Sequence, residues 1–425
     1  MRLYSTLARD LVELPDAPGP IGMYVCGPTV YARAHIGNAR PFVIAAWYKR
    51  WLRHRGYDVT LVHNITDVND KIYEAAPGAS AARAEEATRW YLEDTGRFGL
   101  DEVDQWPKVT EMMDPIIRFI EELVERGFAY EVEGDVYFRV SRWQEYGRLS
   151  GQKPDQVEEQ EPNPRKEDPR DFALWKANKP DEDTWWDSAW GRGRPGWHIE
   201  CSAMAAELLG PVFEIHGGGL DLVFPHHENE LAQSRARGHE FAKLWMHNGM
   251  LRFTGEKMSK SLGNIETIQE VLDEWGRETV LLFFLSAHWR SPIDFSEETM
   301  RQAKAQWMTL MNAFVTPDQG DSGGPAWEEF EAALDDDFNT PQALALMHEW
   351  RRAGNHRLLG NALRLFGLTV RSELVPPELI ALAEERQSAR AQGDYAAADR
   401  FREQVEEAGW EIRDEPGGFQ LVRKP

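Results

Sequence analysis

The feature that most constrains the fold is a strand, a helix and a second strand that follow one another within about 45 residues near the start of the chain. Residues 23–25 (MYV) form a short apolar run that ends in a glycine turn at 26–28 (CGP). A helical pattern follows over 38–55, and residues 59–62 (VTLV) favour a strand. A unit of this kind has parallel strands, so the sequence predicts an α/β fold with a parallel sheet.

This pattern is interrupted in the middle of the chain. A helical segment at 116–126 precedes an alternating stretch at 130–140 that is typical of a hairpin, and 151–171 has the Pro, Glu and Lys content of a surface loop. Apolar strand character returns at 212–215. We therefore expect one sheet with an inserted α/β domain at about 116–195.

The C-terminal part is helical until its last segment. Helical patterns cover 297–314 and 327–334, and residues 316–325 (TPDQGDSGGP) have the composition of a flexible linker. Residues 373–425 favour helices followed by a small strand pair. The order predicts a helical bundle and then a small α+β module.

Composition excludes several classes of protein. A chain of 425 residues is too long for one core, since domains usually run about 100–200 residues. It carries 48 Lys and Arg against 71 Asp and Glu, a net charge of −23, which argues against indiscriminate polyanion binding but not against a local basic face. Mean hydropathy is −0.55, and the apolar run at 280–287 is far shorter than the roughly 20 residues of a membrane span. Residues 1–6 show no secretory signal, so we expect a cytoplasmic protein without membrane contact.

Two short motifs suggest phosphate binding. His35-Ile36-Gly37-Asn38 stands at the expected start of the first helix, where unpaired N–H groups and the helix dipole favour phosphate. Lys257-Met258-Ser259-Lys260-Ser261 is a compact cationic loop that could hold a polyphosphate. Taken singly, the first could be a capped helix with a chance histidine and the second a solvated basic turn.

A third set of residues has metal-ligand chemistry. The only two cysteines are Cys26 and Cys201, and residues 226–230 (HHENE) add imidazole and carboxylate groups. If that stretch is helical, His226 and Glu230 share one face, and two sulfurs, one nitrogen and one oxygen suit zinc. Spacing does not distinguish His226 from His227. The alternative is two buried structural cysteines and a solvated helix start.

With these motifs together, the chain resembles the cysteinyl-tRNA synthetases, which are class I aminoacyl-tRNA synthetases. The resemblance runs nearly from end to end. It is carried by eight stretches: 24–31 (YVCGPTVY), 35–40 (HIGNAR), 64–72 (NITDVNDKI), 171–176 (DFALWK), 193–204 (GRPGWHIECSAM), 216–230 (HGGGLDLVFPHHENE), 256–264 (EKMSKSLGN) and 336–344 (DDFNTPQAL).

The resemblance implies a reaction and the residues that perform it. L-cysteine would be activated by ATP and transferred to tRNA(Cys) by a monomer that holds one zinc ion, with Mg²⁺ on the ATP. The implied zinc ligands are Cys26, Cys201, His226 and Glu230, and the implied cysteine-binding residues are Trp197, Cys26 and Thr66. Those implied for ATP are His35, Gly37, Asn38, Gly218, Asp221 and Lys260, with His35, Asn38, Lys257 and Lys260 as the catalytic groups.

The resemblance also implies how the chain is divided. A class I Rossmann-like catalytic domain would cover 1–115 and 196–250, with the insertion at 116–195 as a connective domain. A region that contains the KMSKS motif and contacts the tRNA stem would follow at 251–300, the helical bundle at 301–372 and an anticodon-binding module at 373–425.

Two departures from the family pattern and two other functions complete the prediction. Asn38 replaces a histidine and can donate a hydrogen bond without carrying charge, and the chain ends FQLVRKP without the usual tryptophan. The alternatives are a cysteine ligase of mycothiol synthesis, which uses an aminosugar acceptor, and a non-catalytic paralogue that binds tRNA or zinc. In the last module, Arg386, Arg390, Arg400 and Arg402 either contact RNA or pair with Glu385, Glu403 and Glu406.

Overall fold

A computed structural model describes residues 1–153, 162–253, 266–315, 318, 324–370, 375–415 and 418–424. The chain divides into two compact units. The first comprises Met1–Glu274, His288–Asp294 and Asp335–Phe338. The second comprises Trp275–Ala287, Phe295–Leu334 and Asn339–Pro425.

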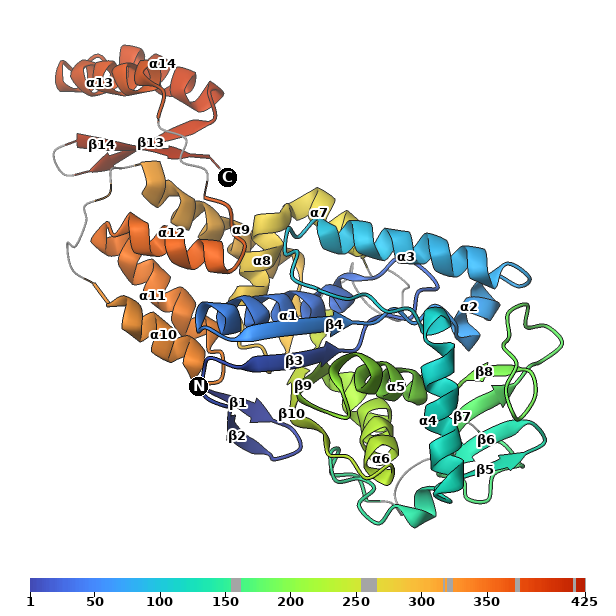
Figure 1. Cartoon of the computed structure of the whole chain (residues 1–425). Helices are drawn as coiled ribbons and strands as arrows, with labels where there is room; N and C mark the ends of the chain where they lie inside the picture. The colour runs from blue at the N-terminus through green and yellow to red at the C-terminus, as the bar shows by residue number, and fades with distance from the viewer. Residues whose placement is uncertain are drawn as a thin grey trace. The chain divides into compact units, whose positions relative to one another are not determined.

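The first unit is built on a four-stranded sheet whose neighbouring strands are all parallel (Figure 1). In spatial order its strands are β10 (Phe241–Asn248), β9 (Val212–Gly219), β3 (Pro20–Val25) and β4 (Asp58–His63). The chain passes from β3 to β4 through α1 (Ile36–His54). The predicted strand–helix–strand unit and its parallel sheet are confirmed.

Helices cover this sheet because each presents a buried face to it. α1 packs along β3, β4, β9 and β10 and buries thirteen of its side chains, Trp47 and Trp51 completely. α5 (Trp197–Leu209) contacts β3 and β9, and α6 (Glu228–Ala236) contacts β10. Burial of large apolar side chains of this kind contributes about 1.5–3 kcal/mol each.

Between β4 and β9 the chain forms a second sheet, which is antiparallel. Its strands in order are β5 (Ala129–Val132), β6 (Asp135–Phe138), β7 (Phe172–Ala177) and β8 (Gly193–Pro195), and α4 (Met113–Glu125) precedes them. The predicted hairpin at 130–140 is confirmed. Its two-residue turn, Glu133 and Gly134, has positive φ at both positions, which matches the right-handed twist of the strands. The loop expected at 151–171 lies partly outside the described residues.

The remaining elements of the first unit are one long helix, α3 (Ser80–Gly96), and several short elements. The short ones are β1 (Arg2–Ser5), β2 (Asp10–Glu13), α2 (Asp70–Ala75), η1 (Val109–Glu111), η2 (Val140–Arg142), η4 (Leu220–Leu222), η5 (Val223–His227) and β11 (Leu251–Phe253). Three boundaries between the units fall within elements: α7 (Ile268–Trp275), β12 (Ile293–Phe295) and α10 (Trp327–Asp335).

The second unit is helical and ends in a small mixed module. Its helices are α8 (Arg277–Leu285), α9 (Glu297–Met311), η7 (Asn312–Val315), α10 (Trp327–Asp335), α11 (Thr340–Ala353) and α12 (His356–Leu365). The module that follows consists of α13 (Pro377–Ala391), α14 (Tyr395–Glu407) and the antiparallel pair β13 (Trp410–Glu415) and β14 (Gly418–Arg423) (Figure 1). Its core includes Leu379, Ala383, Val405, Trp410 and Leu421.

The predicted fold class is therefore confirmed: a parallel-sheet α/β domain with an insertion, then helices, then an α+β module. Within the described part of the chain, no helix is both long and apolar enough to cross a bilayer.

Candidate active site

A pocket of about 320 Å³ opens at the carboxyl ends of the parallel strands. Residues that end or directly follow all four strands line it: Cys26, His63, Gly219 and Asn248. This edge is where α/β sheets place their ligands. Of the residues predicted from the sequence, six line the pocket: Cys26, His35, Gly37, Asn38, Trp197 and Asp221.

Other predicted residues lie away from the pocket lining or outside the described part of the chain. Thr66 is buried: its hydroxyl donates to Glu200 Oε2 at 3.3 Å and accepts from Asn64 Nδ2 at 3.3 Å. Lys257 and Lys260 fall within residues 254–265, which the structure does not describe.

The first turn of α1 forms one wall of the pocket. His35 is the residue that caps the helix, with φ −81° and ψ 161°, and its backbone N–H donates to Asn38 Oδ1 at 3.2 Å. Asn38 thus stabilises the start of the helix, as the side chain at the third position of a capping box does. A Cβ at Gly37 would lie 2.8 Å from the His35 ring, so glycine is needed there to make room for that imidazole.

The glycines at the end of β9 have different roles. A Cβ at Gly218 would lie 2.9 Å from both the His227 ring and Leu222, so this glycine accommodates a buried histidine. Gly219 lines the pocket together with Asp221, and a Cβ on it would meet the Asp221 carboxylate at 2.3 Å. The sequence prediction named Gly218 for ATP binding. In the structure it is the next residue, Gly219, that lies beside Asp221 in the pocket lining.

Beneath the pocket lies a cluster of groups that could bind a metal ion: Cys26, His226, His227 and Glu230. His226 Nε2 is 3.1 Å from Glu230 Oε1, and Cys26 Sγ is 3.6 Å from each of these two atoms. His227 Nε2 lies 3.3 Å from the same sulfur and 3.9 Å from Glu230 Oε1. Both histidines that spacing could not distinguish are therefore present in the cluster.

The predicted ligand Cys201 lies beside this cluster rather than within it. Its thiol donates a hydrogen bond to Asn64 Oδ1 at 3.8 Å. Both cysteines are free and buried, on the turn after β3 and on α5.

The cluster is buried and lacks a compensating cation among the described residues. Glu230 is fully buried, and this burial raises the pKa of its carboxyl well above the usual value. Among the described residues, Glu230 Oε2 accepts no hydrogen bond. His216 Nε2 lies 3.2 Å from this oxygen, but it does not point an N–H at it. Burial likewise raises the pKa of the Cys26 thiol, with Cys201 and Glu230 adding to the effect, and it lowers the pKa of His226.

These properties fit a zinc ion. Ligands bonded to zinc at about 2.0–2.3 Å in a tetrahedron lie about 3.3–3.8 Å apart, close to the separations found here. A divalent cation would also compensate the buried carboxylate and thiol. The second nitrogen of His226 lies 3.0 Å from His198 Nδ1, and that of His227 lies 2.7 Å from His247 Nε2. These neighbours can orient the two rings, as the outer partners of ligating histidines do, although here the partner is an imidazole rather than the usual carboxylate, carbonyl or water.

Two buried histidines accompany the predicted residues. His216 belongs to the stretch 216–221, which the resemblance implies for the nucleotide pocket, and it stacks on Tyr24 of the adjacent strand. His63 was not predicted, and its ring is 2.8 Å from the Tyr91 hydroxyl. Both histidines are buried, and burial lowers the pKa of His63 to about 4. The signal was available: His63 ends the apolar strand β4, at the sheet edge where polar side chains collect.

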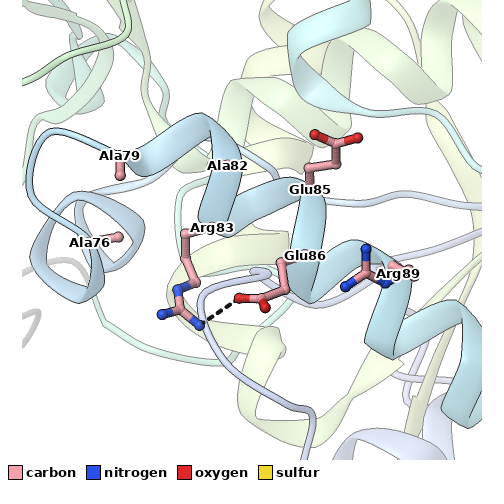
Figure 2. Close-up of a pocket in the computed structure, with 7 residues that line it drawn as sticks. All are labelled: Ala76, Ala79, Ala82, Arg83, Glu85, Glu86 and Arg89. Atoms are coloured by element: carbon pink, nitrogen blue, oxygen red, sulfur yellow. Dashed lines mark hydrogen bonds and ion pairs between the residues drawn. The ribbon is translucent and has the colours of Figure 1, made fainter.

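Another hollow is larger than this pocket. A pocket of about 440 Å³ lies along α2 and α3, lined by three alanines and by Arg83, Glu85, Glu86 and Arg89 (Figure 2). Arg83 and Glu86 pair at 3.1 Å. The residues that line it include no cysteine or histidine, so its chemistry does not suggest an active site.

Comparison with known proteins decides the family. Residues 14–305 match the family described as tRNA synthetases class I (C) catalytic domain, and 329–365 match a DALR domain. A cysteine–tRNA ligase of Streptococcus pneumoniae is 41% identical over all of both chains. The chain belongs to the cysteinyl-tRNA synthetase family.

A second relative supports the same family, and a solved structure shares the fold. A cysteine–tRNA ligase of Alkalilimnicola ehrlichii is 45% identical over 95% of each chain. The solved methionyl-tRNA synthetase of Mycobacterium tuberculosis, bound by methionyl-adenylate, shares the fold with a TM-score of 0.60 at 14% identity, over 82% of this chain and 84% of that one.

Proposed function

We propose that this chain activates L-cysteine with ATP and transfers it to tRNA(Cys). The observation that carries the proposal is the buried group of Cys26, His226 and Glu230 directly beneath a pocket whose wall is the start of α1. Groups that could hold a thiol-selective metal and a helix terminus suited to phosphate would thus face one cavity, whose volume is in the range of small-molecule pockets. Family membership supports the same reaction.

We propose Cys26, Cys201, His226 and Glu230 as the ligands of one zinc ion, with His227 as an orienting neighbour. When bound, zinc would supply a Lewis acid that stabilises the thiolate form of the substrate. Serine has a harder, much less acidic hydroxyl, so the metal can discriminate where shape alone gives only about 10²-fold. Trp197, whose ring is 4.3 Å from that of His226, would form the wall around the substrate side chain, with Thr66 below.

The first step is attack of the cysteine carboxylate on the α-phosphate of ATP, with loss of pyrophosphate. No covalent enzyme nucleophile is required, so the residues act by alignment and by stabilising charge. His35 and Asn38 would do so from the start of α1, with Lys257 and Lys260 on the phosphates and Mg²⁺ bound to ATP. Gly37, Gly218 and Asp221 would shape the part of the site that binds the nucleotide. Asp221 would accept hydrogen bonds from the ribose hydroxyls.

In the second step a hydroxyl of the terminal ribose of the tRNA attacks the carbonyl carbon of the adenylate and releases AMP. We propose that the region 251–300 contacts the stem of the tRNA and that the module 373–425 reads its anticodon. We further propose that the enzyme works in the cytoplasm as a monomer.

The test is exchange of pyrophosphate into ATP, measured with cysteine and with serine, followed by charging of tRNA(Cys). We expect cysteine-dependent exchange, at least about 10³-fold less with serine, and charging of tRNA. Exchange without charging, together with transfer to an aminosugar, would favour the mycothiol-type ligase. Zinc or tRNA binding without exchange would favour the non-catalytic paralogue.

A further inference from the structure

Arg40 is a buried cation that the proposed mechanism does not use. It lies on α1, two residues after Asn38, and its side chain is completely buried. Few arginines are buried in this way unless they are paired, because removing a charge from water is costly.

Among the residues that the structure describes, the hydrogen bonds of this guanidinium go only to backbone oxygens. Its Nη1 donates to Gly249 O at 2.6 Å and its Nη2 to His288 O at 3.1 Å. Its Nε has no hydrogen-bond partner among the described residues. These bonds connect α1 to two separate stretches of the first unit.

Within the described ranges, no carboxylate pairs with Arg40. Asp337, which like Arg40 acts electrostatically on His288, is bound to Arg290. Burial lowers the pKa of Arg40 to about 10, so the guanidinium stays protonated at neutral pH. The charge is therefore present and uncompensated by the described groups.

The bonds of Arg40 join two walls of the active-site pocket. His35, Gly37 and Asn38 of α1 form one wall, and Asn248, Gly249 and Met250 form another. The backbone at Ser291 packs closely against the second wall, since a Cβ on Gly249 would lie 2.2 Å from Ser291 O. Arg40 does not itself line the pocket, so its positive charge stands behind these walls and would act on an anion in the cavity from there.

We propose that Arg40 is a positioning residue for the phosphates of ATP: it holds the two walls together and its uncompensated charge attracts the anionic part of the nucleotide. This inference rests on the proposed function, because it assumes that ATP occupies the pocket. A buried charge acts at longer range than an exposed one, since salt screens it less.

The experiment compares ligands that differ in charge. Adenosine, AMP and ATP are titrated by calorimetry into the full chain and into Arg40→Gln, which keeps a donor without charge, and Arg40→Lys, which keeps the charge. We expect Arg40→Gln to weaken ATP binding about tenfold or more, AMP less, and adenosine by no more than about twofold. Arg40→Lys should retain most of the preference for ATP over adenosine.

Arg50→Gln is the matched control, since Arg50 lies on the same helix but pairs with Glu102 at 2.7 Å and does not line the pocket. Equal weakening of adenosine and ATP in Arg40→Gln would overturn the proposal and leave a purely structural role. If Arg40→Gln does not fold, as judged by its thermal transition, Arg40→Lys decides. An ATP-to-adenosine preference within about threefold of the parent chain supports the role of charge, and a tenfold fall refutes it.

The two proposals fail separately. Should the unaltered chain neither bind ATP nor exchange pyrophosphate, the proposed function itself is wrong. If it does both, while Arg40→Gln keeps the full preference for ATP, only the role of Arg40 is refuted.

Discussion

Ionisable groups have opposite environments in two regions of the molecule. One region is the cluster beneath the pocket, here called the pocket floor, and the other is the C-terminal module. On the floor, Cys26, His226 and Glu230 are buried together without a cation among the described residues. In the module, Arg386 and Arg390 both bond Asp414, at 2.7 and 2.5 Å, and Arg402 bonds Glu406 at 2.8 Å.

The difference indicates which buried charges need a bound ligand as their counter-charge. A buried group without a counter-charge is costly unless something binds there, whereas an exposed pair contributes only about 0–1 kcal/mol and requires no ligand. The pocket floor thus has the chemistry of a binding site in its own side chains. The ion pairs of the module do not by themselves indicate a binding site, so RNA binding by the module has to be tested by substituting its arginines one at a time.

The largest effect should come from removing a metal ligand. Cys201→Ser and Glu230→Gln should each lose bound zinc on dialysis and reduce cysteine-dependent exchange by at least about 10²–10³-fold, because each removes one donor of four. Elemental analysis of the purified chains measures the metal directly.

His227→Gln is the comparison that sharpens this test. An orienting neighbour should cost about 10–100-fold in zinc affinity, so this variant should keep its zinc on dialysis and release it to a chelator earlier than the parent chain does. If His227→Gln loses zinc while Cys201→Ser retains it, the ligand set is the cluster of Cys26, His226, His227 and Glu230.

The next largest effect concerns Lys260, outside the described residues. Lys260→Ala should slow adenylate formation by about 10²–10³-fold while cysteine binding changes little, since the contact strengthens as charge develops on the phosphates. Single-turnover formation of the adenylate measures it. Lys243→Ala is the control, because Lys243 is exposed and pairs with Glu214 at 3.3 Å. Equal slowing in both variants would argue against a specific role for Lys260.

A smaller effect separates the two units. Deleting residues 373–425 should leave pyrophosphate exchange nearly intact, because the pocket lies in the first unit. Charging should weaken mainly through a KM for tRNA raised about tenfold, with a reduced dependence on salt. Unchanged charging by the truncated chain would show that the module does not read the anticodon, and would favour the aminosugar ligase.

The sequence was sufficient for three strands of the main sheet, β3, β4 and β9, for the hairpin and for the final strand pair, because each has a local pattern. The fourth strand, β10, was not predicted. Nor were β1 and β2, because residues 6–9 (TLAR) between them contain no glycine, proline or asparagine that would indicate a hairpin turn. In the site, helical spacing placed His226 and Glu230 on one face, but it could not choose between two adjacent histidines.

Which groups meet at the site depended on the fold rather than on local pattern. The cluster draws on Cys26 and on residues 226–230, which are about 200 positions apart and meet only because β3 pairs with β9. Gly37 shows a similar limit: the resemblance implied it for ATP binding, yet the nearest obstacle to a side chain at this position is the ring of His35.

The smallest predicted effect tests the module one arginine at a time. The sequence named four arginines as RNA contacts or as members of ion pairs, and the pairs of Arg386 and Arg390 turn out to be with Asp414 rather than Glu385. Arg386 is also only 7% exposed, so it offers little surface to RNA.

Arg400 is exposed on α14 and, in the described part of the chain, has no ion pair. Arg400→Ala should therefore raise the KM for tRNA about fivefold and lower the slope of log KM against log salt by about 1, as loss of one phosphate contact does. Arg402→Ala, two positions away and paired with Glu406, should change neither quantity. The same KM and the same slope in both variants would mean that the module binds RNA through other residues or not at all.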